Sequence, residues 1–211
     1  MFYQLLQGGG SLKGKSKHKY QKNYASHSTA DALLLDGGVE DYEYLKMSRA
    51  SIDGVDDREE WRLLKSALDI VGFTPTEQLD LFRIIAAVLH IGNIEITADR
   101  SDQAQMKIPA QAEKACHLLG IPLQEFTKAV LRPKVLAGRE WVTQARTKQQ
   151  ALDELSALCK TLYEKSFGAL VDRINRALER PTPKSTFIGV LDIAGFEIFV
   201  RFFIVCASID S

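Results

Sequence analysis

Residues 74–92, which read TPTEQLDLFRIIAAVLHIG, decide the fold of this chain. Thr74 is a favourable N-cap, Pro75 suits the first helical turn, and Glu77 lies where a capping box needs an acidic residue. The apolar side chains that follow lie on nearly all sides of the helix, and such a helix is buried. Gly92 ends it. The stretch therefore predicts a buried helix in a mainly α-helical protein.

Apolar residues at helical spacing predict further helices on both sides of this one. Asp57 and Glu60 resemble a capping box at the start of a helix that ends at Gly72. Residues 151–178 carry the longest apolar stripe, roughly 45 Å at 1.5 Å per residue. Two shorter helices are predicted at residues 111–119 and 123–131.

Strand signals are few and short. Residues 94–96 alternate between apolar and charged side chains, and residues 135–143 look extended or looped. Residues 187–191, FIGVL, read as a strand covered on both faces. We therefore expect a mainly α-helical fold with one or two short strands, which belong to a larger sheet completed outside this sequence.

Composition narrows the class of protein. Hydrophobic residues make up 45% and charged residues 26%, the balance of a globular chain. Lys+Arg and Asp+Glu are equal at 27 each, so no long-range attraction to nucleic acid or anionic membrane is expected. The N-terminus has no signal-peptide pattern, and no apolar run is long enough to span a bilayer. We expect a cytoplasmic protein without a membrane span.

Cysteine and histidine give no sign of a metal site. Cys116, Cys159 and Cys206 lie far apart and form no CxxC pair, which favours a reducing compartment. His90 and His117 have no second ligand at metal-binding spacing, so we interpret them as core or surface histidines.

Residues 8–30 are rich in glycine and lysine and have no apolar period, which indicates an exposed, flexible, basic loop. Within it, Gly9–Ser16 formally fits the G-x-x-x-x-G-K-[ST] phosphate loop. That loop works only between a strand and a helix. Leu5 and Leu6 read instead as a helix end, and residues 18–23 are not amphipathic. We interpret the match as chance. A small NTPase that uses Gly9–Ser16 stays as an alternative.

The strongest chemical signal is Asp192-Ile193-Ala194-Gly195-Phe196-Glu197, directly after the predicted strand. An aspartate at the carboxyl end of a buried strand lies where open α/β sheets bind ligands, and it can hold Mg²⁺ through water. Gly195 lets a backbone N–H approach a phosphate oxygen. Taken alone, the pattern Asp-x-x-Gly favours an ordinary strand end followed by a turn.

The flanking residues make the pattern specific. Residues 189–197, GVLDIAGFE, closely resemble the switch II segment of myosin motors. The resemblance covers residues 2–10 and 31–199 and is closest to conventional, class II non-muscle and fungal-like myosins. It is carried mainly by residues 2–6 (FYQLL), 40–45 (EDYEYL), 82–94 (FRIIAAVLHIGNI) and 160–175.

The resemblance implies a role for each switch residue. Asp192 would lie near the Mg²⁺ of bound ATP, and Gly195 would donate its backbone N–H to the γ-phosphate. Glu197 would pair with a switch I arginine and position the attacking water, while Phe196 would couple the switch to mechanical elements. ATP and Mg²⁺ are thus the cofactors of the intact motor. The family's phosphate-binding loop and switch I lie upstream of Met1. We therefore expect the chain alone to be inactive and to bind neither ATP nor Mg²⁺ tightly.

Residues 133–143 resemble a surface loop that contacts actin in this family, with Lys134, Val135 and Arg139 as candidate contacts. Ordinary solvated charges are the other interpretation of Lys134 and Arg139. The implied partners are the actin filament and other parts of the same motor domain, in the actin cytoskeleton and myosin complex. Binding of light chains and dimerisation through a tail are expected only of the intact myosin. A helical actin-interaction module without nucleotide chemistry is a further alternative.

The resemblance also predicts the domain organisation. Residues 1–199 would be part of a motor domain with the P-loop NTPase-like α/β fold, in the upper central subdomain. Residues 11–30 look like an insertion, and residues 200–211 look unrelated to the family. Every valine codon begins with GT, the usual first bases of an intron, so translation into an unspliced intron from Val200 is one explanation of this tail.

Overall fold

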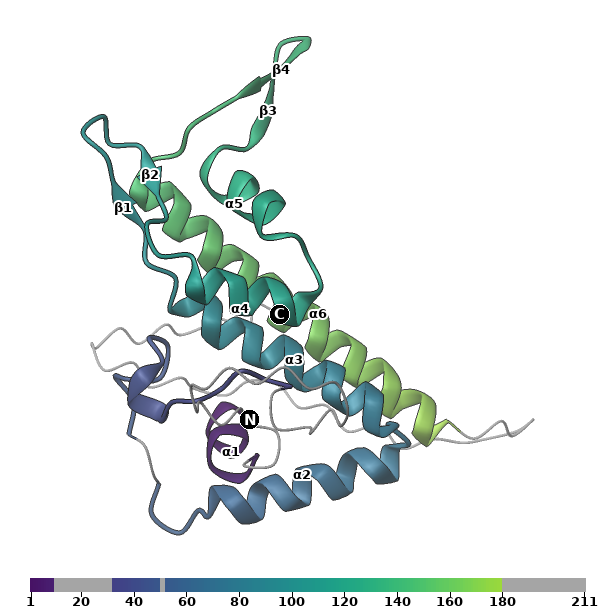
Figure 1. Cartoon of the computed structure of the whole chain (residues 1–211). Coiled ribbons are helices and arrows are strands. Elements are labelled where there is room, and N and C mark those ends of the chain that lie inside the picture. The colour runs from purple at the N-terminus through teal and green to yellow at the C-terminus, as the bar shows by residue number, and fades with distance from the viewer. Residues whose placement is uncertain (10–31, 50–51, 180–211) are drawn as a thin grey trace, which may run out of the picture. The chain divides into compact units, whose positions relative to one another are not determined.

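The computed structural model describes residues 1–9, 32–49 and 52–179 (Figure 1). Their fold is mostly helical, as the sequence predicts, but the described strands form two separate antiparallel sheets of two strands each, where one or two strands of a larger sheet were expected. The predicted strand at 187–191 lies outside the described residues. The elements in chain order are α1 (Phe2–Gly8), the 3₁₀ turn η2 (Val39–Asp41), α2 (Asp57–Val71), α3 (Pro75–Gly92), β1 (Thr97–Ala98), β2 (Ala104–Gln105), α4 (Ala110–Leu119), α5 (Leu123–Leu131), β3 (Lys134–Ala137), β4 (Glu140–Thr143) and α6 (Lys148–Leu178).

Helix α3 is the centre of the unit, and it packs along both α4 and α6 (Figure 1). The predicted capping box is present, since the Thr74 hydroxyl accepts from the backbone N–H of Glu77 and the Glu77 carboxylate accepts from that of Thr74. From Ile85 to Ile91 every side chain is buried. The prediction of a helix buried on nearly all sides is confirmed.

Two apolar clusters share α3. One joins α1, α2 and residues 33–45 to the stretch of α3 from Phe82 to Leu89, and in it the rings of Trp61 and Phe82 lie 4.7 Å apart. The other joins the end of α3 to α4, α5, β2 and the first half of α6. Because α3 contributes to both clusters, it ties the unit Met1–Leu178 together.

Two local predictions need correction. Asp56, not Asp57, is the N-cap of α2, and its carboxylate accepts from the backbone N–H of Arg58 at 2.9 Å. The strand predicted at residues 94–96 lies instead at Thr97–Ala98, where it pairs with β2. Residues 94–96 are not a strand, because the backbone N–H of Ile94 still bonds the carbonyl of Ile91 as the helix ends. Their alternation reflects only that Ile94 and Ile96 are buried and Glu95 is exposed.

The other predicted helices are confirmed within a few residues. Gly120 ends α4 in the left-handed conformation, with φ +68°, and α5 has the predicted bounds. The 31-residue helix α6 begins at Lys148, and only its first half is buried. Phe167 is 57% exposed and Leu178 72%. The predicted apolar stripe is therefore real, but its second half is only partly covered, since Leu170 packs on the first cluster whereas Phe167 and Leu178 are exposed. No helix of the described residues is long and apolar enough to cross a membrane.

Candidate functional site

The predicted nucleotide residues Asp192, Gly195, Phe196 and Glu197 lie outside the described residues, so their roles stay predictions. Of the alternative phosphate loop at 9–16, only Gly9 is described. It is the C-cap of α1, and its backbone N–H bonds the carbonyl of Leu5 at 3.0 Å. A helix therefore precedes this segment, whereas a phosphate loop follows a strand.

The predicted actin-contact segment forms a two-stranded hairpin of β3 and β4, which extends away from the helices (Figure 1). Gly138 and Arg139 make the turn between the paired residues Ala137 and Glu140. Gly138 has φ +66°, and Arg139 is not among the described residues with positive φ. A positive φ at the first turn position alone is the pattern of a type II′ turn, where glycine is favoured.

Pairing register divides the hairpin into two faces, because directly opposite residues share a face. On one face Leu136 pairs with Trp141, next to the pair of Lys134 with Thr143. Leu136 is 58% exposed and Trp141 68%. The outer face thus presents an apolar pair beside a lysine, with no contact that hides it among the described residues.

The hairpin places the three predicted contacts differently. Lys134 lies on the outer face, and the exposed Arg139 lies at the turn. Val135 is half-buried on the opposite face and lines a groove of about 400 Å³ against α6. The exposed Leu136 and Trp141 were missed by the sequence analysis. The sequence does contain a signal for this pair. The two-residue turn begins with a glycine, and Leu136 and Trp141 lie two residues before and after it, which predicts that they face each other in a hairpin.

Backbone and side-chain bonds fix the base of the hairpin. The Gln144 backbone N–H bonds the carbonyl of Pro133, and that of Arg146 bonds the carbonyl of Leu131, both at 3.0 Å. The guanidinium of Arg146 pairs with Glu154 of α6 at 2.8 Å. The base of the hairpin is therefore bonded to the end of α5 and to α6.

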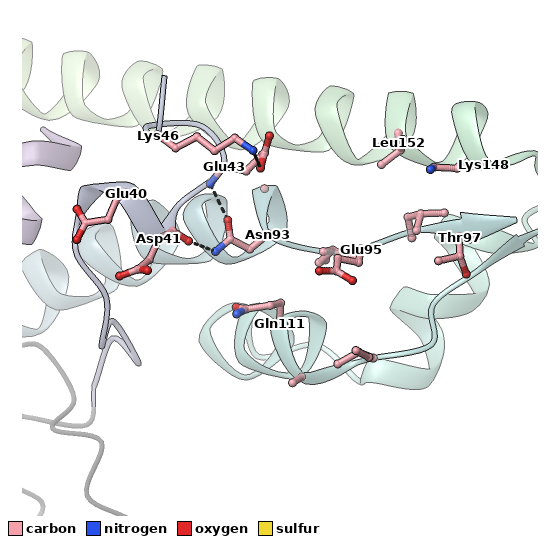
Figure 2. Close-up of a pocket in the computed structure, with 15 residues that line it drawn as sticks. Glu40, Asp41, Glu43, Lys46, Asn93, Glu95, Thr97, Gln111, Lys148 and Leu152 are labelled. Carbon is pink, nitrogen blue, oxygen red and sulfur yellow. Dashed lines mark hydrogen bonds and ion pairs between the residues drawn. The ribbon is translucent and has the colours of Figure 1, made fainter. Parts of the chain in front are cut away.

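A second cavity, of about 880 Å³, lies elsewhere, between residues 40–46, the end of α3 and the starts of α4 and α6 (Figure 2). At one end the Asn93 amide donates to the carbonyl of Asp41 and accepts from the backbone N–H of Glu43. Its lining has more carboxylates than amines and, among the described residues, neither histidine nor cysteine. Nor do the described residues contain a group of His, Cys, Asp or Glu spaced to hold a metal ion. We assign the cavity no chemistry.

Comparison with known proteins decides the family. The model of the family described as myosin head (motor domain) matches residues 19–202, most of the chain. The chain belongs to the myosin head family. This confirms the resemblance found in the sequence. The match begins within the segment predicted as an insertion and ends beyond Phe199, and the predicted domain boundaries stay predictions.

Curated relatives agree with this membership. Myosin type-2 heavy chain 1 of Schizosaccharomyces pombe is 44% identical over 202 residues, which cover 95% of this chain and 12% of the relative. Myosin type-2 heavy chain 2 of the same yeast is 44% identical over 200 residues, 94% of this chain and 9% of the relative. Myosin-1 of Saccharomyces cerevisiae is 40% identical over 200 residues, which cover 94% of this chain and 10% of that relative. The chain thus spans about a tenth of the length of these relatives.

Within this myosin head chain, His90 is a core residue. It is 1% exposed, and its Nδ1 lies 2.9 Å from the Gln111 Oε1 and its Nε2 3.4 Å from the carbonyl oxygen of Leu33. Burial lowers the pKa of His90 below its ordinary value, and nearby Lys114 adds to this, while the bond to Gln111 opposes it. His117 is exposed on α4. The described structure therefore gives His90 a packing role.

Proposed function

We propose that this chain is a segment of the motor domain of a class II-type myosin, an ATP-driven motor that moves on actin in the cytoskeleton. Membership of the family and 44% identity to two type-2 heavy chains support the proposal. The described unit would be the upper central subdomain. The exposed apolar residues on the second half of α6 fit a surface that packs on other parts of the same motor domain.

We propose further that the outer face of the β3–β4 hairpin contacts the actin filament. One observation carries this: the exposed pair of Leu136 and Trp141 lies beside Lys134 on a hairpin fixed at its base. Exposed aromatic side chains with neighbouring cations are typical of residues that dominate protein interfaces. Arg139 at the turn adds a second cation toward an acidic partner.

Co-sedimentation of the chain with actin filaments without nucleotide tests the hairpin proposal. Trp141→Ala should weaken binding at least about fivefold, since interface aromatics contribute more than about 1 kcal/mol. Lys134→Ala should weaken it less and mainly at low salt. Tyr163→Ala is the matched control, because Tyr163 is 63% exposed on α6, away from the hairpin. Equal binding by all variants would refute the hairpin as an actin contact.

The γ-phosphate sensor is a separate proposal, which rests on residues 189–197 and on family membership. Asp192 would hold Mg²⁺ through water, the Gly195 N–H would bond the γ-phosphate, and Glu197 would position water. In a longer protein that carries this segment, Gly195→Ala and Glu197→Ala should slow ATP hydrolysis far more than they weaken ATP binding. Single-turnover hydrolysis with a parallel nucleotide-binding assay decides it. Unchanged turnover in both variants would mean that this turn is not switch II.

We also propose that residues 11–30 are an insertion and that residues 200–211 lie outside the functional motor. The support is the residue-level resemblance, which skips residues 11–30 and stops at Phe199, and the GT that begins every valine codon; the family match over residues 19–202 overlaps both segments. Sequencing the mature transcript across the Phe199 codon is the test. A message that reads through to Ser211 in most copies would refute the intron explanation.

A further inference from the structure

Arg146 joins the end of the hairpin to two helices at once. Its Nη1 donates to the carbonyl oxygens of Ala129 at 2.9 Å and Val130 at 3.0 Å, both in the last turn of α5. Its Nη2 lies 2.8 Å from the Glu154 carboxylate on α6. Its own backbone N–H bonds the carbonyl of Leu131. One side chain thus links the exit of β4, the end of α5 and the first half of α6.

The chemistry of these contacts requires an arginine. The last carbonyls of a helix have no intrahelical donor, and a basic side chain near the C-terminus can satisfy them. A guanidinium offers several donors in a rigid plane, so it can bond two carbonyls and a carboxylate together. A lysine ammonium is a single point charge and cannot reproduce this geometry. The Arg146 side chain is only 20% exposed, so the contacts are partly shielded from water.

The hairpin depends on its base for its orientation. In the described structure β3 and β4 form a sheet of their own, and all positions of β4 are exposed. A two-stranded hairpin alone is only marginally stable. A groove lined by Val135, Arg146 and Glu154 separates it in part from α6. The Arg146 contacts are therefore a side-chain link between the segment that leaves β4 and the helices α5 and α6.

We infer that Arg146 is a positioning residue, which holds the hairpin at a fixed angle to α6 and so presents the Leu136–Trp141 face in one orientation. The consequence for actin rests on the function proposed above. A surface held in its bound orientation loses less conformational freedom on binding, so a looser hairpin binds its partner more weakly. Neither Arg146 nor Glu154 needs to touch the partner for this effect.

Fluorine NMR can measure the orientation directly. The chain has two tryptophans, so 5-fluorotryptophan labelling gives one signal from Trp141 and one from Trp61. Trp61 is buried in the core and serves as an internal control. Arg146→Lys and the milder Glu154→Gln should change the relaxation of the Trp141 signal toward greater mobility and leave that of Trp61 unchanged. Arg62→Lys is the matched control, since Arg62 pairs with Glu59 on the exposed face of α2.

Actin co-sedimentation of the same variants tests the consequence. Arg146→Lys should weaken binding about two- to tenfold, the range expected when one ordered surface group becomes mobile, and Arg62→Lys should not. Unchanged mobility of Trp141 in both Arg146→Lys and Glu154→Gln would overturn the positioning role. Increased mobility with unchanged actin affinity would overturn the consequence for binding, provided that Trp141→Ala weakens binding. If Trp141→Ala has no effect, the proposed actin contact itself fails, and the NMR result still decides the role of Arg146.

Discussion

Arg173 and Gly72 lie 101 positions apart in the sequence, yet the Nη2 of Arg173 donates a 2.5 Å hydrogen bond to the carbonyl oxygen of Gly72. The same guanidinium lies over the ring of Phe73, 5.5 Å from its centre, and 3.7 Å from the Glu77 carboxylate. Gly72 and Phe73 form the turn between α2 and α3. Arg173 therefore fastens the second half of α6, which has no fully buried side chain, to the turn that precedes the central helix α3.

Arg173→Ala should lower the free energy of unfolding by about 2 kcal/mol, because a charged hydrogen bond to a backbone carbonyl contributes about 1.5–3 kcal/mol. Arg176→Ala is the matched control, since the one bond of Arg176 among the described residues lies within its own helix and its side chain is exposed. It should change stability by less than about 0.5 kcal/mol. Urea denaturation of both variants measures the difference. Equal stabilities would show that the contact does not hold α6 in solution.

Gln78 is a second polar link, buried between α2 and α3 with 1% of its surface exposed. Its Nε2 donates to the Asp69 carboxylate at 2.7 Å and to the carbonyl of Phe73 at 3.0 Å, while its Oε1 accepts from Lys65. Gln78→Leu should therefore cost about 1–3 kcal/mol, since it removes three part-buried hydrogen bonds, two of them to charged side chains. Thermal and urea denaturation measure the loss.

Gln149→Leu provides the control for that experiment. Gln149 makes a similar 2.9 Å bond to Asp153, but on the exposed face of α6, where water can replace the lost partner. A loss in Gln149→Leu as large as in Gln78→Leu would contradict the argument from burial.

These contacts show which parts of the structure could be predicted. Helix ends follow from neighbouring residues, as at Thr74 and Glu77, so they could be read from the sequence. The partners of Arg173 and Arg146 are set by how helices pack, and one sequence does not reveal which distant side chains meet. The same holds for the candidate site: the exposure of Lys134 could be anticipated, and the glycine turn could have indicated the pairing of Leu136 with Trp141, but the contacts of Arg146 with Ala129, Val130 and Glu154 could not be predicted.

The burial of His90 predicts a pH dependence. Its pKa is lowered in the folded chain from the ordinary value of 6.5, mainly by burial. Below pH 6.5 the unfolded chain gains a proton at His90 that the folded chain does not bind, so stability falls as pH falls from 6.5 toward the folded pKa. The loss should be at most about 1.4 kcal/mol per pH unit.

Urea denaturation between pH 7.5 and 5 measures this loss (a range of roughly one unit above and below the histidine value). His90→Gln should flatten the dependence, even if it lowers stability at every pH. His117→Gln is the matched control, because His117 is exposed on α4, and it should keep the dependence of the unmodified chain. A pH dependence that is equally steep in all three proteins would exclude His90 as its source.

The last prediction concerns the segment Gly9–Ser16, which fits the phosphate-loop pattern by sequence. A phosphate loop needs the strand before it to aim its backbone amides at the phosphates. Here the helix α1 ends at Gly8, and the Gly9 N–H is already used to cap it. Lys15→Ala should therefore leave the response of the chain to Mg·ATP unchanged, as should Lys22→Ala in the same basic segment. Isothermal titration of the chain and both variants is the measurement, and we expect no micromolar binding in any of them. Micromolar binding that is lost in Lys15→Ala but kept in Lys22→Ala would establish the small NTPase instead.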